Sequence, residues 1–363
     1  MNKRSEKIFA HVSTQDYMNA GDIVLTRCVR AAFTGQFGVT KWLLVPVDRP
    51  INTLAIDKIN ETEKLIIGGG GLFLPSTNTN NISGWEWAVP ENLLRKITAS
   101  IIVYSVGYNY FKGQKPTELF KNNLAALVEK SSFFGLRNHG SIEAVRALIP
   151  DELKSKVIYQ PCITALINRL ANLPPKPQNF KNNIAVNLAF DRYEMRYGDK
   201  MDDILRQITA AVKIISEKGY KIFYVCHVDS DKYFIRYLKQ ENIQFSLVKL
   251  DKSSAEDIIG FYNQMGMTIG MRGHSLMVPF GLNCEILSLD SHDKTRWFLE
   301  DIDALDWNIN LRENIDSLAE EIINKFEIIH EKNYSEIKNR LVSQQEKLLK
   351  ITKDNLDIIA KLS

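Results

Sequence analysis

The stretch KLIIGGGGLF, residues 64–73, joins a short apolar run to four consecutive glycines. An apolar, β-branched run that ends in glycine is typical of a buried strand that stops at a turn. Similar runs occur on both sides of it, and longer helical patterns separate them. We expect strands at 7–12, 42–47, 64–71, 99–107 and 132–138, with helices over 23–35, 120–131 and 140–148. Strands that alternate with helices predict parallel βαβ units in an open twisted sheet.

The segment NLPPKPQNFKNN, residues 172–183, interrupts this alternation with three prolines and several polar residues. Such a composition is typical of a linker. Beyond it we expect strands at 183–190, 221–228, 245–251, 267–273 and 285–290, with helices over 201–218, 233–243 and 255–264. The sequence therefore predicts an α/β protein with two domains of similar size. We place the N-terminal domain at 1–173, the linker at 174–182 and the C-terminal domain at 183–312.

The remaining residues, 313–363, differ in pattern from both domains. Apolar residues recur there at three- and four-residue spacing, with lysines and glutamates between them. This spacing predicts one or two amphipathic helices. We expect this tail to pack across the two domains. A helix at a dimer interface, which would make the protein a homo-oligomer, or a helix on a membrane surface is the alternative.

Composition narrows the classes of function. A chain of 363 residues exceeds what one hydrophobic core usually organises, and a net charge of +3 gives no broad basic field for nucleic acid. The four cysteines are far apart, which fits a reducing compartment and argues against a disulfide framework or structural zinc. We find no signal-peptide pattern and no apolar run near the roughly 20 residues that span a bilayer. These features predict a cytoplasmic protein that binds no nucleic acid.

The segment GMRGHSLMVPFG, residues 270–281, carries the clearest functional signal. It runs from a strand through a turn to a helix, so Arg272 and His274 should project from the carboxyl edge of the second sheet. A guanidinium suits bidentate recognition of carboxylate or phosphate, and an imidazole gains and loses a proton near neutral pH. The pair predicts an anion-binding site beside an acid/base group, although a single histidine is often structural.

The N-terminal half offers two sites where backbone can approach a ligand. Glycines have no Cβ atom, so Gly69, Gly70 and Gly71 could bring their amides close to an anion or a sugar; a tight turn is the alternative. Asn19, Gly21 and Asp22 lie between the first strand and its helix, where open α/β sheets bind ligands. Asp22 could equally serve as a helix cap.

Arg137 ends a strand just before a helix that starts near Ser141. Both the guanidinium and a helix N-terminus are positive, so an anion between them would explain the arrangement. Pairing of Arg137 with an acidic side chain is the alternative. His139 is expected at the surface.

Two polar segments are candidates for sugar contact. One contains Trp85, Glu86 and Trp87, whose indoles could stack on a sugar face or fill a gap in their own domain; the other contains Arg192, Tyr193 and Glu194. His227 and Asp229 have no third partner at a spacing typical of a metal site, so we expect no metal.

Taken together, four motifs resemble the polysaccharide pyruvyl transferase family over roughly residues 10 to 300. They are the Asn-x-Gly-Asp segment 19–22, the glycines 68–71, Arg137 ahead of a Ser-led helix, and the run 270–294. The resemblance implies two Rossmann-like domains with parallel sheets in a GT-B-like arrangement. It also implies transfer of a pyruvyl group from phosphoenolpyruvate to sugar hydroxyls, with a ketal formed and phosphate released.

By the same resemblance, Arg137, Arg272 and Gly273 would bind the donor and His274 would be the catalytic acid/base residue. An apolar residue usually occupies the position of Gly273, and an acid often follows the first arginine, where this chain has Asn138. The acceptor would be a saccharide of a cell-surface polysaccharide or its precursor, carried on a lipid or a nucleotide. A lipid carrier would bring the protein to the inner face of the cytoplasmic membrane as a peripheral protein.

The chemistry of this donor agrees with the residues. Phosphoenolpyruvate carries up to about three negative charges, so its site needs fixed cations and amide dipoles. Proton transfers to carbon and from the hydroxyls need a positioned acid/base group, and no metal or redox cofactor is required. Two alternatives remain: a GT-B glycosyltransferase with a nucleotide-sugar donor, and a catalytically silent scaffold or sugar-binding protein.

Overall fold

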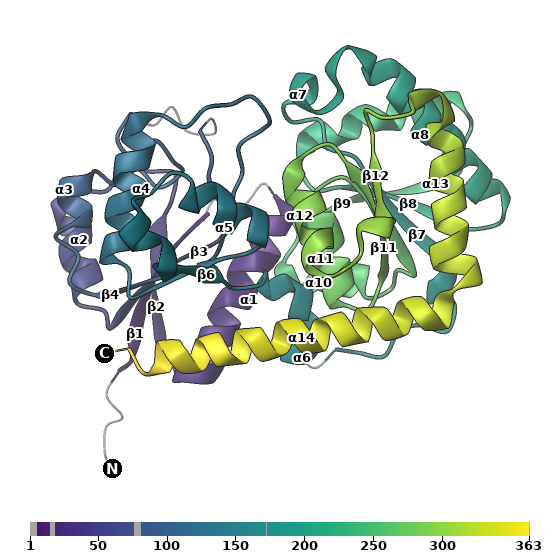
Figure 1. Ribbon diagram of the computed structural model, residues 1–363. Coiled ribbons are helices and arrows are strands. Elements are labelled where there is room, and N and C mark those ends of the chain that lie inside the picture. The colour runs from purple at the N-terminus through teal and green to yellow at the C-terminus, as the bar shows by residue number, and fades with distance from the viewer. Residues whose placement is uncertain (1–5, 15–18, 76–80, 172, 363) are drawn as a thin grey trace. The chain divides into compact units, whose positions relative to one another are not determined.

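The computed structural model describes residues 6–14, 19–75, 81–171 and 173–362 (Figure 1). Two compact units divide the chain, and neither is one continuous segment. Unit 1 holds residues 1–16, 25–163 and 349–363, and unit 2 holds residues 17–24 and 164–348. The first turn of one helix therefore belongs to unit 2 although its remainder belongs to unit 1.

Unit 1 is a doubly wound α/β unit with a six-stranded sheet in the order β2-β1-β3-β4-β5-β6. All of its neighbouring strands pair in parallel. The strands are β1 (Ile8–Ser13), β2 (Lys41–Pro46), β3 (Lys64–Phe73), β4 (Ser100–Tyr108), β5 (Phe133–Leu136) and β6 (Val157–Tyr159). The helices that follow them are α1 (Ala20–Phe37), α2 (Thr53–Asn60), α3 (Glu91–Leu94), α4 (Glu118–Lys130) and α5 (His139–Arg146).

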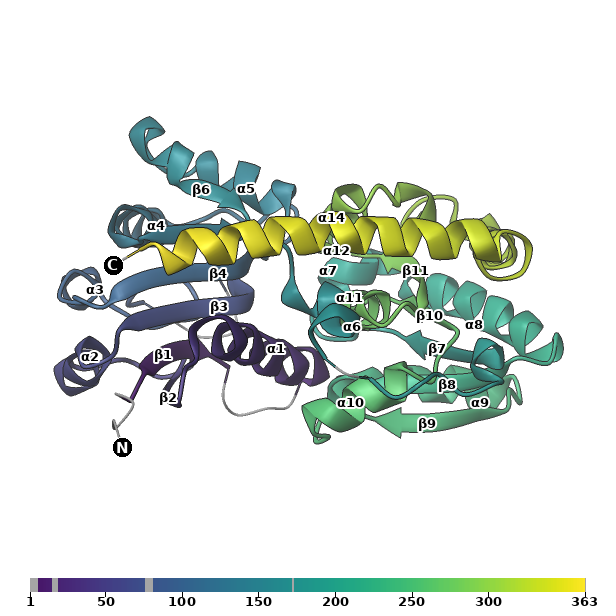
Figure 2. The ribbon, with the colours of Figure 1, turned by 90° about the horizontal axis from the view of Figure 1, so that it is seen from below.

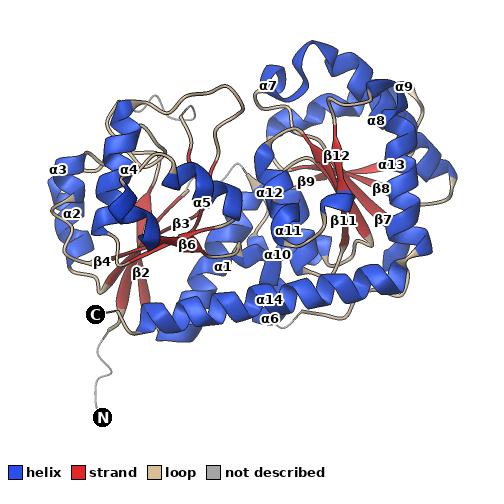
Figure 3. Ribbon diagram, in the orientation of Figure 1, coloured by secondary structure: helices blue, strands red, loops and turns tan. Residues whose placement is uncertain are grey.

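Alternation along the strands of unit 1 sends apolar side chains to both faces of the sheet, as a parallel sheet requires. On one face, Ala10 and Leu65 belong to the cluster that contains Ile56 of α2 and Phe120 of α4. On the other face, the Phe9 ring packs against Phe33 of α1 with 6.4 Å between ring centroids. Helices therefore cover both faces (Figure 3).

Unit 2 repeats the architecture with a second parallel sheet, in the order β12-β11-β10-β7-β8-β9. Its strands are β7 (Asn183–Asn187), β8 (Lys221–Cys226), β9 (Phe245–Lys249), β10 (Met267–Gly270), β11 (Glu285–Asp290) and β12 (Asn308–Asn310). Its helices are α6 (Ile167–Leu170), α7 (Tyr193–Tyr197), α8 (Met201–Glu217), α9 (Ile235–Gln240), α10 (Ala255–Tyr262), α11 (His274–Gly281), α12 (Asp293–Asp301) and α13 (Leu318–Phe326). The predicted α/β fold with two parallel sheets is confirmed.

The tail folds into α13 and the long helix α14 (Tyr334–Ala360), so the predicted amphipathic helices are confirmed (Figure 2). α14 begins in unit 2 and ends in unit 1. In unit 2 the side chain of Gln345 hydrogen-bonds to Asn168 at 2.9 Å. In unit 1 the Asn355 Nδ2 donates to the Tyr159 carbonyl oxygen at 2.9 Å.

The predicted linker, 174–182, belongs to unit 2. The Asn263 Nδ2 donates to the Pro174 carbonyl oxygen at 2.9 Å, and the His330 Nε2 lies 2.8 Å from the Lys181 carbonyl oxygen. Prolines remove backbone donors, but their carbonyls still accept hydrogen bonds, so a proline-rich segment can be held on a domain surface. The division between the units falls instead between Ile163 and Thr164.

The predicted glycine turn is wrong, because Gly68, Gly69, Gly70 and Gly71 lie inside β3. A Cβ on Gly68 would lie 2.3 Å from the Tyr104 carbonyl oxygen, and one on Gly69 would lie 3.0 Å from the Leu25 side chain. The glycines therefore let β3 pack closely against α1 and β4. This packing accounts for Gly68 and Gly69 without a ligand.

Candidate functional site

The strand order of unit 2 changes direction between β7 and β10, and four charged or polar loops leave the sheet beside that point. Open α/β sheets bind ligands at this switch, outside the carboxyl ends of the strands. Residue Gly270 at the end of β10 pairs in register with Asn187 at the end of β7. The following loops bring together Asp191, Arg196, Asp231, Arg272 and Ser291, as the contacts below show.

Arg272 follows β10, and its guanidinium is held by two carboxylates. Its Nε donates to Asp231 Oδ2 at 2.9 Å and its Nη2 donates to Asp231 Oδ1 at 2.6 Å. The same Nη2 lies 2.6 Å from Asp191 Oδ1, and 12% of the Arg272 side chain is exposed. Burial alone would lower the pKa of Arg272, but Asp231 and Asp191 raise it above its ordinary value. The sequence predicted that Arg272 projects from the carboxyl edge to bind an anion, and in the structure its guanidinium is paired with two carboxylates of the chain itself.

Asp231 is the fixed partner in this arrangement. Its side chain is fully buried, and its Oδ2 accepts from the backbone N–H of His227 at 3.0 Å and of Val228 at 3.3 Å. The Asn187 Nδ2 adds a fourth donor to the same oxygen at 3.3 Å. Asp231 therefore fixes the direction of the Arg272 fork. The sequence interpretation considered His227 and Asp229 but missed Asp231, which nothing in the local pattern distinguishes.

Asp191 lies in the loop after β7 and contacts a second arginine. The Arg196 Nη2 donates to Asp191 Oδ2 at 2.9 Å, and the Arg196 Nε donates to the Asp191 carbonyl oxygen at 2.8 Å. The Arg196 Nη1 donates to Ser291 Oγ at 3.1 Å. Burial raises the pKa of Asp191, but Arg272 and Arg196 outweigh it and hold the pKa well below its usual range. The carboxylate stays ionised between two cations.

His274 is the first residue of α11 and is buried, with 9% of its surface exposed. The first turn of α1 packs directly against it. A Cβ on Gly21 would lie 2.5 Å from His274 Nδ1, so only glycine fits at that position. The structure thus brings the predicted N-terminal motif and the predicted acid/base residue together within unit 2.

Asn19 shapes that turn. Its Oδ1 accepts from the Gly21 N–H at 3.0 Å and its Nδ2 donates to Asp22 Oδ2 at 2.9 Å. Because α1 starts at Ala20, Asn19 rather than Asp22 is the N-cap residue. The Ala20 N–H donates to the His227 carbonyl oxygen at 3.1 Å, which attaches the turn to the loop after β8.

His227 lies behind these groups and is fully buried. Burial, with the charges of Arg272 and His274, lowers its pKa well below the ordinary value, so the ring is neutral. Its Nε2 lies 2.6 Å from the Tyr262 hydroxyl. Within the described part of the chain, Nδ1 of His227 has no hydrogen-bond partner.

Gly273, between the arginine and the histidine, is in an ordinary helical conformation with φ −52° and ψ −47°. A Cβ there would lie 3.9 Å from Met277 Cε and 4.0 Å from Lys294 Cε, which is van der Waals distance. A Cβ atom, the first atom of any larger side chain, therefore fits at this position. Gly273 is therefore not required by backbone conformation or by space.

Arg137 lies in unit 1, at the end of β5, and is 6% exposed. A Cβ on Gly107 would lie 2.2 Å from Arg137 Nε, so the guanidinium packs on the backbone of β4 only because residue 107 is glycine. Asn138 caps α5 by accepting from the Ser141 N–H at 2.8 Å. Binding of one donor by both Arg137 and Arg272 stays a prediction.

A comparison with known protein families matches the part of the chain that contains these residues. A family model described as "Polysaccharide pyruvyl transferase" matches residues 19–293. The chain belongs to this family. The matched region includes the first turn of α1, Arg137, and the loops that carry Asp191, Asp231, Arg272 and His274. No protein of curated function matches the sequence.

Solved structures resemble this pyruvyl transferase family member in fold. The S. aureus MnaA–UDP co-structure has a TM-score of 0.60 at 10% identity, over 98% of this chain and 99% of that chain. The UDP-GlcNAc 2-epimerase from Neisseria meningitidis bound to UDP-GlcNAc has a TM-score of 0.55 at 10% identity, over 98% of this chain and 100% of that chain. An alpha-glucosyltransferase (AGT) in complex with UDP has a TM-score of 0.53 at 11% identity, over 98% of this chain and 100% of that chain. The fold class is thus the two-domain, GT-B-like α/β fold.

Of the two roles considered for Trp85 and Trp87, filling a gap in their own domain is confirmed, because neither indole is exposed for stacking on a sugar. Their exposed fractions are 1% and 0%, and their rings pack against each other with centroids 6.0 Å apart. The Trp85 Nε1 donates to Asn123 Oδ1 at 2.7 Å. Burying two large aromatic surfaces stabilises unit 1 more than exposure would. Glu86, between them, donates its N–H to the Leu72 carbonyl oxygen at 3.1 Å, so this loop is held within unit 1.

The second acceptor candidate stays a prediction. Tyr193, at the start of α7, is 50% exposed, and Arg192 before it has a positive φ of 54°. The Tyr193 hydroxyl lies 3.3 Å from Glu194 Oε1. This short helix follows Asp191 directly, so its exposed ring lies next in sequence to the charged cluster.

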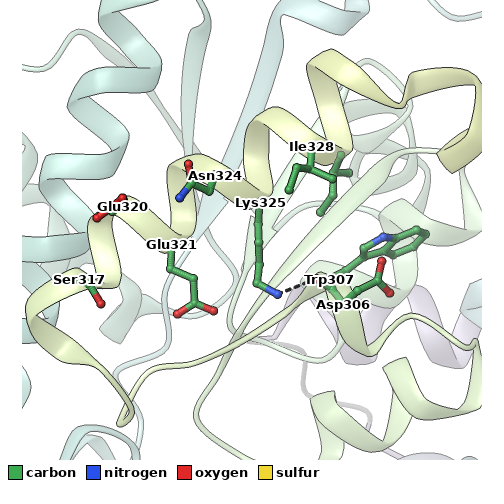
Figure 4. A pocket seen from close by; sticks show the side chains of 9 residues that line it. Asp306, Trp307, Ser317, Glu320, Glu321, Asn324, Lys325 and Ile328 are labelled. Carbon is green, nitrogen blue, oxygen red and sulfur yellow. Dashed lines mark hydrogen bonds between the residues drawn. The ribbon is translucent and has the colours of Figure 1, made fainter.

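A separate pocket of about 470 Å³ lies at the other end of unit 2 (Figure 4). It is lined by residues of α13 and by Asp306 and Trp307, which precede β12 at the amino edge of the sheet. The Lys325 Nζ donates to the Asp306 carbonyl oxygen at 2.7 Å. None of the predicted site residues lines it.

Metal sites and membrane spans are considered for residues 6–14, 19–75, 81–171 and 173–362. No group of three or more histidine, cysteine or acidic side chains there could hold a metal ion. No helix in these ranges combines the length and apolarity needed to cross a bilayer.

Proposed function

We propose that this protein transfers the pyruvyl group of phosphoenolpyruvate to two hydroxyls of a sugar in a cell-surface polysaccharide or its precursor. The family supports a transferase of polysaccharide biosynthesis with a saccharide acceptor. The observation that carries the donor assignment is the position of His274. It begins α11 at the switch point, two residues after an arginine whose fork is fixed by Asp231.

The proposed reaction joins C2 of the donor to two hydroxyls of one sugar. A sugar hydroxyl adds to C2 of the donor and gives up its proton, while a proton is delivered to the C3 methylene, which becomes a methyl group. The C2–O bond to phosphate then breaks, and a second hydroxyl of the same sugar adds to C2 and gives up its proton. The products are the cyclic ketal and phosphate, and the steps as written use no metal or redox cofactor.

His274 is proposed to deliver and accept these protons. The N-terminal end of α11 favours negative charge, so the donor's anionic groups would bind there, with Arg272 and the Gly273 amide. Asn19 and Gly21 are proposed to hold the imidazole in place, because the turn they form packs on it. Arg137 stays a separate donor-binding proposal.

The test compares donors and one variant. Purified protein is incubated with pyranosides that carry free 4,6- or 3,4-diols, and with either phosphoenolpyruvate or a UDP-sugar. We expect phosphate release from the first donor and no UDP release from the second. His274→Gln should lower the rate by about 10² or more, the usual scale for general acid/base catalysis. His139→Gln, an exposed position in unit 1, is the matched control and should keep the rate.

UDP release without phosphate release would replace the proposal with a nucleotide-sugar glycosyltransferase. An unchanged rate in His274→Gln would remove the acid/base role.

A further inference from the structure

Two carboxylates face Arg272, and they are held very differently. Asp231 is fully buried and receives hydrogen bonds from Arg272, Asn187 and two backbone N–H groups. Asp191 has a side chain that is 38% exposed. Its Oδ1, the oxygen 2.6 Å from Arg272, accepts no aligned hydrogen bond within the described residues. Asp231 is thus wholly buried, while Asp191 keeps part of its side chain in contact with solvent, although the Oδ1 that faces Arg272 is itself buried.

The backbone that carries Asp191 also differs from the backbone that carries Asp231. Asp231 lies at the start of a helical segment, Asp229–Phe234, directly beneath the Arg272 fork. Asp191 lies in the loop between β7 and α7, followed by Arg192 at a positive φ of 54°. Its other anchor, Arg196, also binds the Asp191 carbonyl oxygen and Ser291 Oγ. Arg196 would therefore keep two of its contacts if the Asp191 carboxylate left.

The place of the Asp191 carboxylate is also the place where a ligand anion is expected. It lies between two guanidinium groups, after the strand that pairs with β10 at the switch point. An oxyanion of similar size, either a carboxylate or a phosphate, could make the same contacts. Phosphoenolpyruvate carries both groups.

We propose that the Asp191 carboxylate occupies an anion subsite in the protein without ligand, and that a substrate carboxylate or phosphate displaces it onto Arg272 and Arg196. This inference deepens the proposed function and rests on it for the identity of the donor. After this displacement Arg272 binds the donor. Arg196 is a second cation in the subsite, and the sequence did not indicate it. Asp191 is a specificity-determining residue, because an incoming anion must outcompete a carboxylate that is already in place.

The displacement has a cost that can be measured. A protein whose binding-competent state is only partly populated binds its ligand more weakly by that fraction. If Asp191 occupies the subsite about nine-tenths of the time, its removal should tighten anion binding about tenfold, or about 1.4 kcal/mol. A purely structural carboxylate would give the opposite result, because its loss would loosen the site.

The main experiment measures binding of inorganic phosphate, oxalate and phosphoenolpyruvate by calorimetry at pH 7.5. Asp191→Asn keeps an oxygen for Arg196 but removes the charge that faces Arg272. We expect it to bind at least one of the two simple anions about tenfold more tightly than the wild type does, and the preferred anion identifies which group of the donor takes the subsite. Asp306→Asn is the control, since Asp306 forms an ion pair with Arg340 at 2.7 Å at the amino edge of the sheet. It makes the same change in net charge and should leave anion binding unchanged.

Unchanged or weaker binding of both simple anions by Asp191→Asn would overturn the inference. So would an equal gain in Asp306→Asn, because the effect would then follow net charge alone. A crystal structure of the wild-type protein with oxalate or phosphate bound needs no variant. There the Asp191 carboxylate should lie beyond ion-pair distance of Arg272, and a retained pair beside a bound anion would contradict displacement.

The outcomes separate this inference from the proposed function. Tighter anion binding by Asp191→Asn, with no phosphate release from phosphoenolpyruvate by the wild type, would support the subsite and reject the donor. Phosphate release by the wild type, with no gain in anion binding by the variant, would support the donor and reject the displacement.

Discussion

The two sheets of this protein use their switch points in different ways. In unit 1, glycines in β3 lie beside β1, and the space that side chains would fill is taken by Tyr104 and Leu25. In unit 2, the loops after β7, β8 and β10 carry two arginines and two aspartates that neutralise one another. The same topological position thus serves close packing in one unit and a charged cluster in the other. Arg272 of the charged cluster in unit 2 lies two residues before His274, and we propose that the donor binds and reacts there.

The largest effect is expected when the Asp231 carboxylate, which holds Arg272 in the charged cluster of unit 2, is removed. Asp231→Asn would leave Arg272 nearly buried without its bidentate partner, and breaking a buried pair in this way costs about 3 kcal/mol or more. We expect that loss in the free energy of unfolding, measured with urea. Asp306→Asn removes an exposed pair and should change the stability by less than about 1 kcal/mol. Equal losses in the two variants would mean that the cluster is no more than a surface network.

A pair of glycine substitutions compares the two units directly. In Gly21→Ala, the new Cβ would meet His274 Nδ1 at 2.5 Å and push the imidazole away. Since a displacement of about 1 Å can cost about 10² in rate, we expect a large loss of turnover. In Gly69→Ala, the new Cβ would meet the Leu25 side chain at 3.0 Å. Overpacking there should cost about 1–3 kcal/mol of stability with turnover of the folded fraction retained.

Turnover and thermal unfolding of both variants check this comparison. If Gly69→Ala abolishes turnover of the folded protein, or Gly21→Ala leaves it intact, the functional difference between the units is wrong.

A pH prediction concerns the neutral histidine of unit 1. His11 is buried, with Nε2 on the Gly68 carbonyl oxygen and Nδ1 accepting from Arg30 Nε at 3.1 Å. Burial lowers the pKa of His11 to about 3, and the nearby Arg30 charge adds to this, against the hydrogen bond to Gly68. Between pH 6.5 and 3 the unfolded chain therefore binds a proton that the folded protein does not. Stability must fall as the pH is lowered through this window, by up to about 1.4 kcal/mol per pH unit.

In His11→Gln the amide can keep both hydrogen bonds without titrating. Urea unfolding between pH 7 and 5 should therefore show a shallower loss of stability on acidification than the wild type shows. His139→Gln, at an exposed position, should follow the wild-type curve. Identical slopes in all three proteins would show that His11 is protonated in the folded state.

The smallest effect is expected at Gly273, between the two residues of the motif. Ala fits the helical conformation and the available space there. We expect Gly273→Ala to raise stability by about 0.4–1 kcal/mol through the unfolded state. Turnover should change by less than about threefold, since the backbone amide stays in place and the neighbouring contacts are at van der Waals distance. A tenfold loss would mean that this glycine makes a close approach to the substrate.

The sequence predicted the parts of the fold that periodicity controls. The expected strand at 42–47 is β2 (Lys41–Pro46), and the one at 285–290 is β11 (Glu285–Asp290). The short strands β6 and β12, three residues each, carry too few residues for a pattern and were not predicted. For Trp85 and Trp87 the sequence left sugar stacking and burial both open, because the polarity of their neighbours describes the loop and not the indoles.

The candidate site was predicted only in part, for a physical reason. Arg272, His274 and the turn of Asn19 and Gly21 each follow a strand, and carboxyl edges bring such loops together. Asp231 and Asp191 act through their pairing with Arg272, from which they lie 41 and 81 residues away in the sequence, so no local pattern marks them. The buried role of Gly107 beneath Arg137 is visible only once the strands are paired.

The central claim is that the carboxyl edge of the unit 2 sheet is where the donor reacts, and a crystal structure with phosphoenolpyruvate tests it most directly. We predict donor density at the N-terminus of α11, with an anionic group on Arg272 and the methylene carbon within reach of the His274 imidazole. Donor bound elsewhere, for example in the pocket beside Trp307, with the Asp191–Arg272 pair intact, would contradict it.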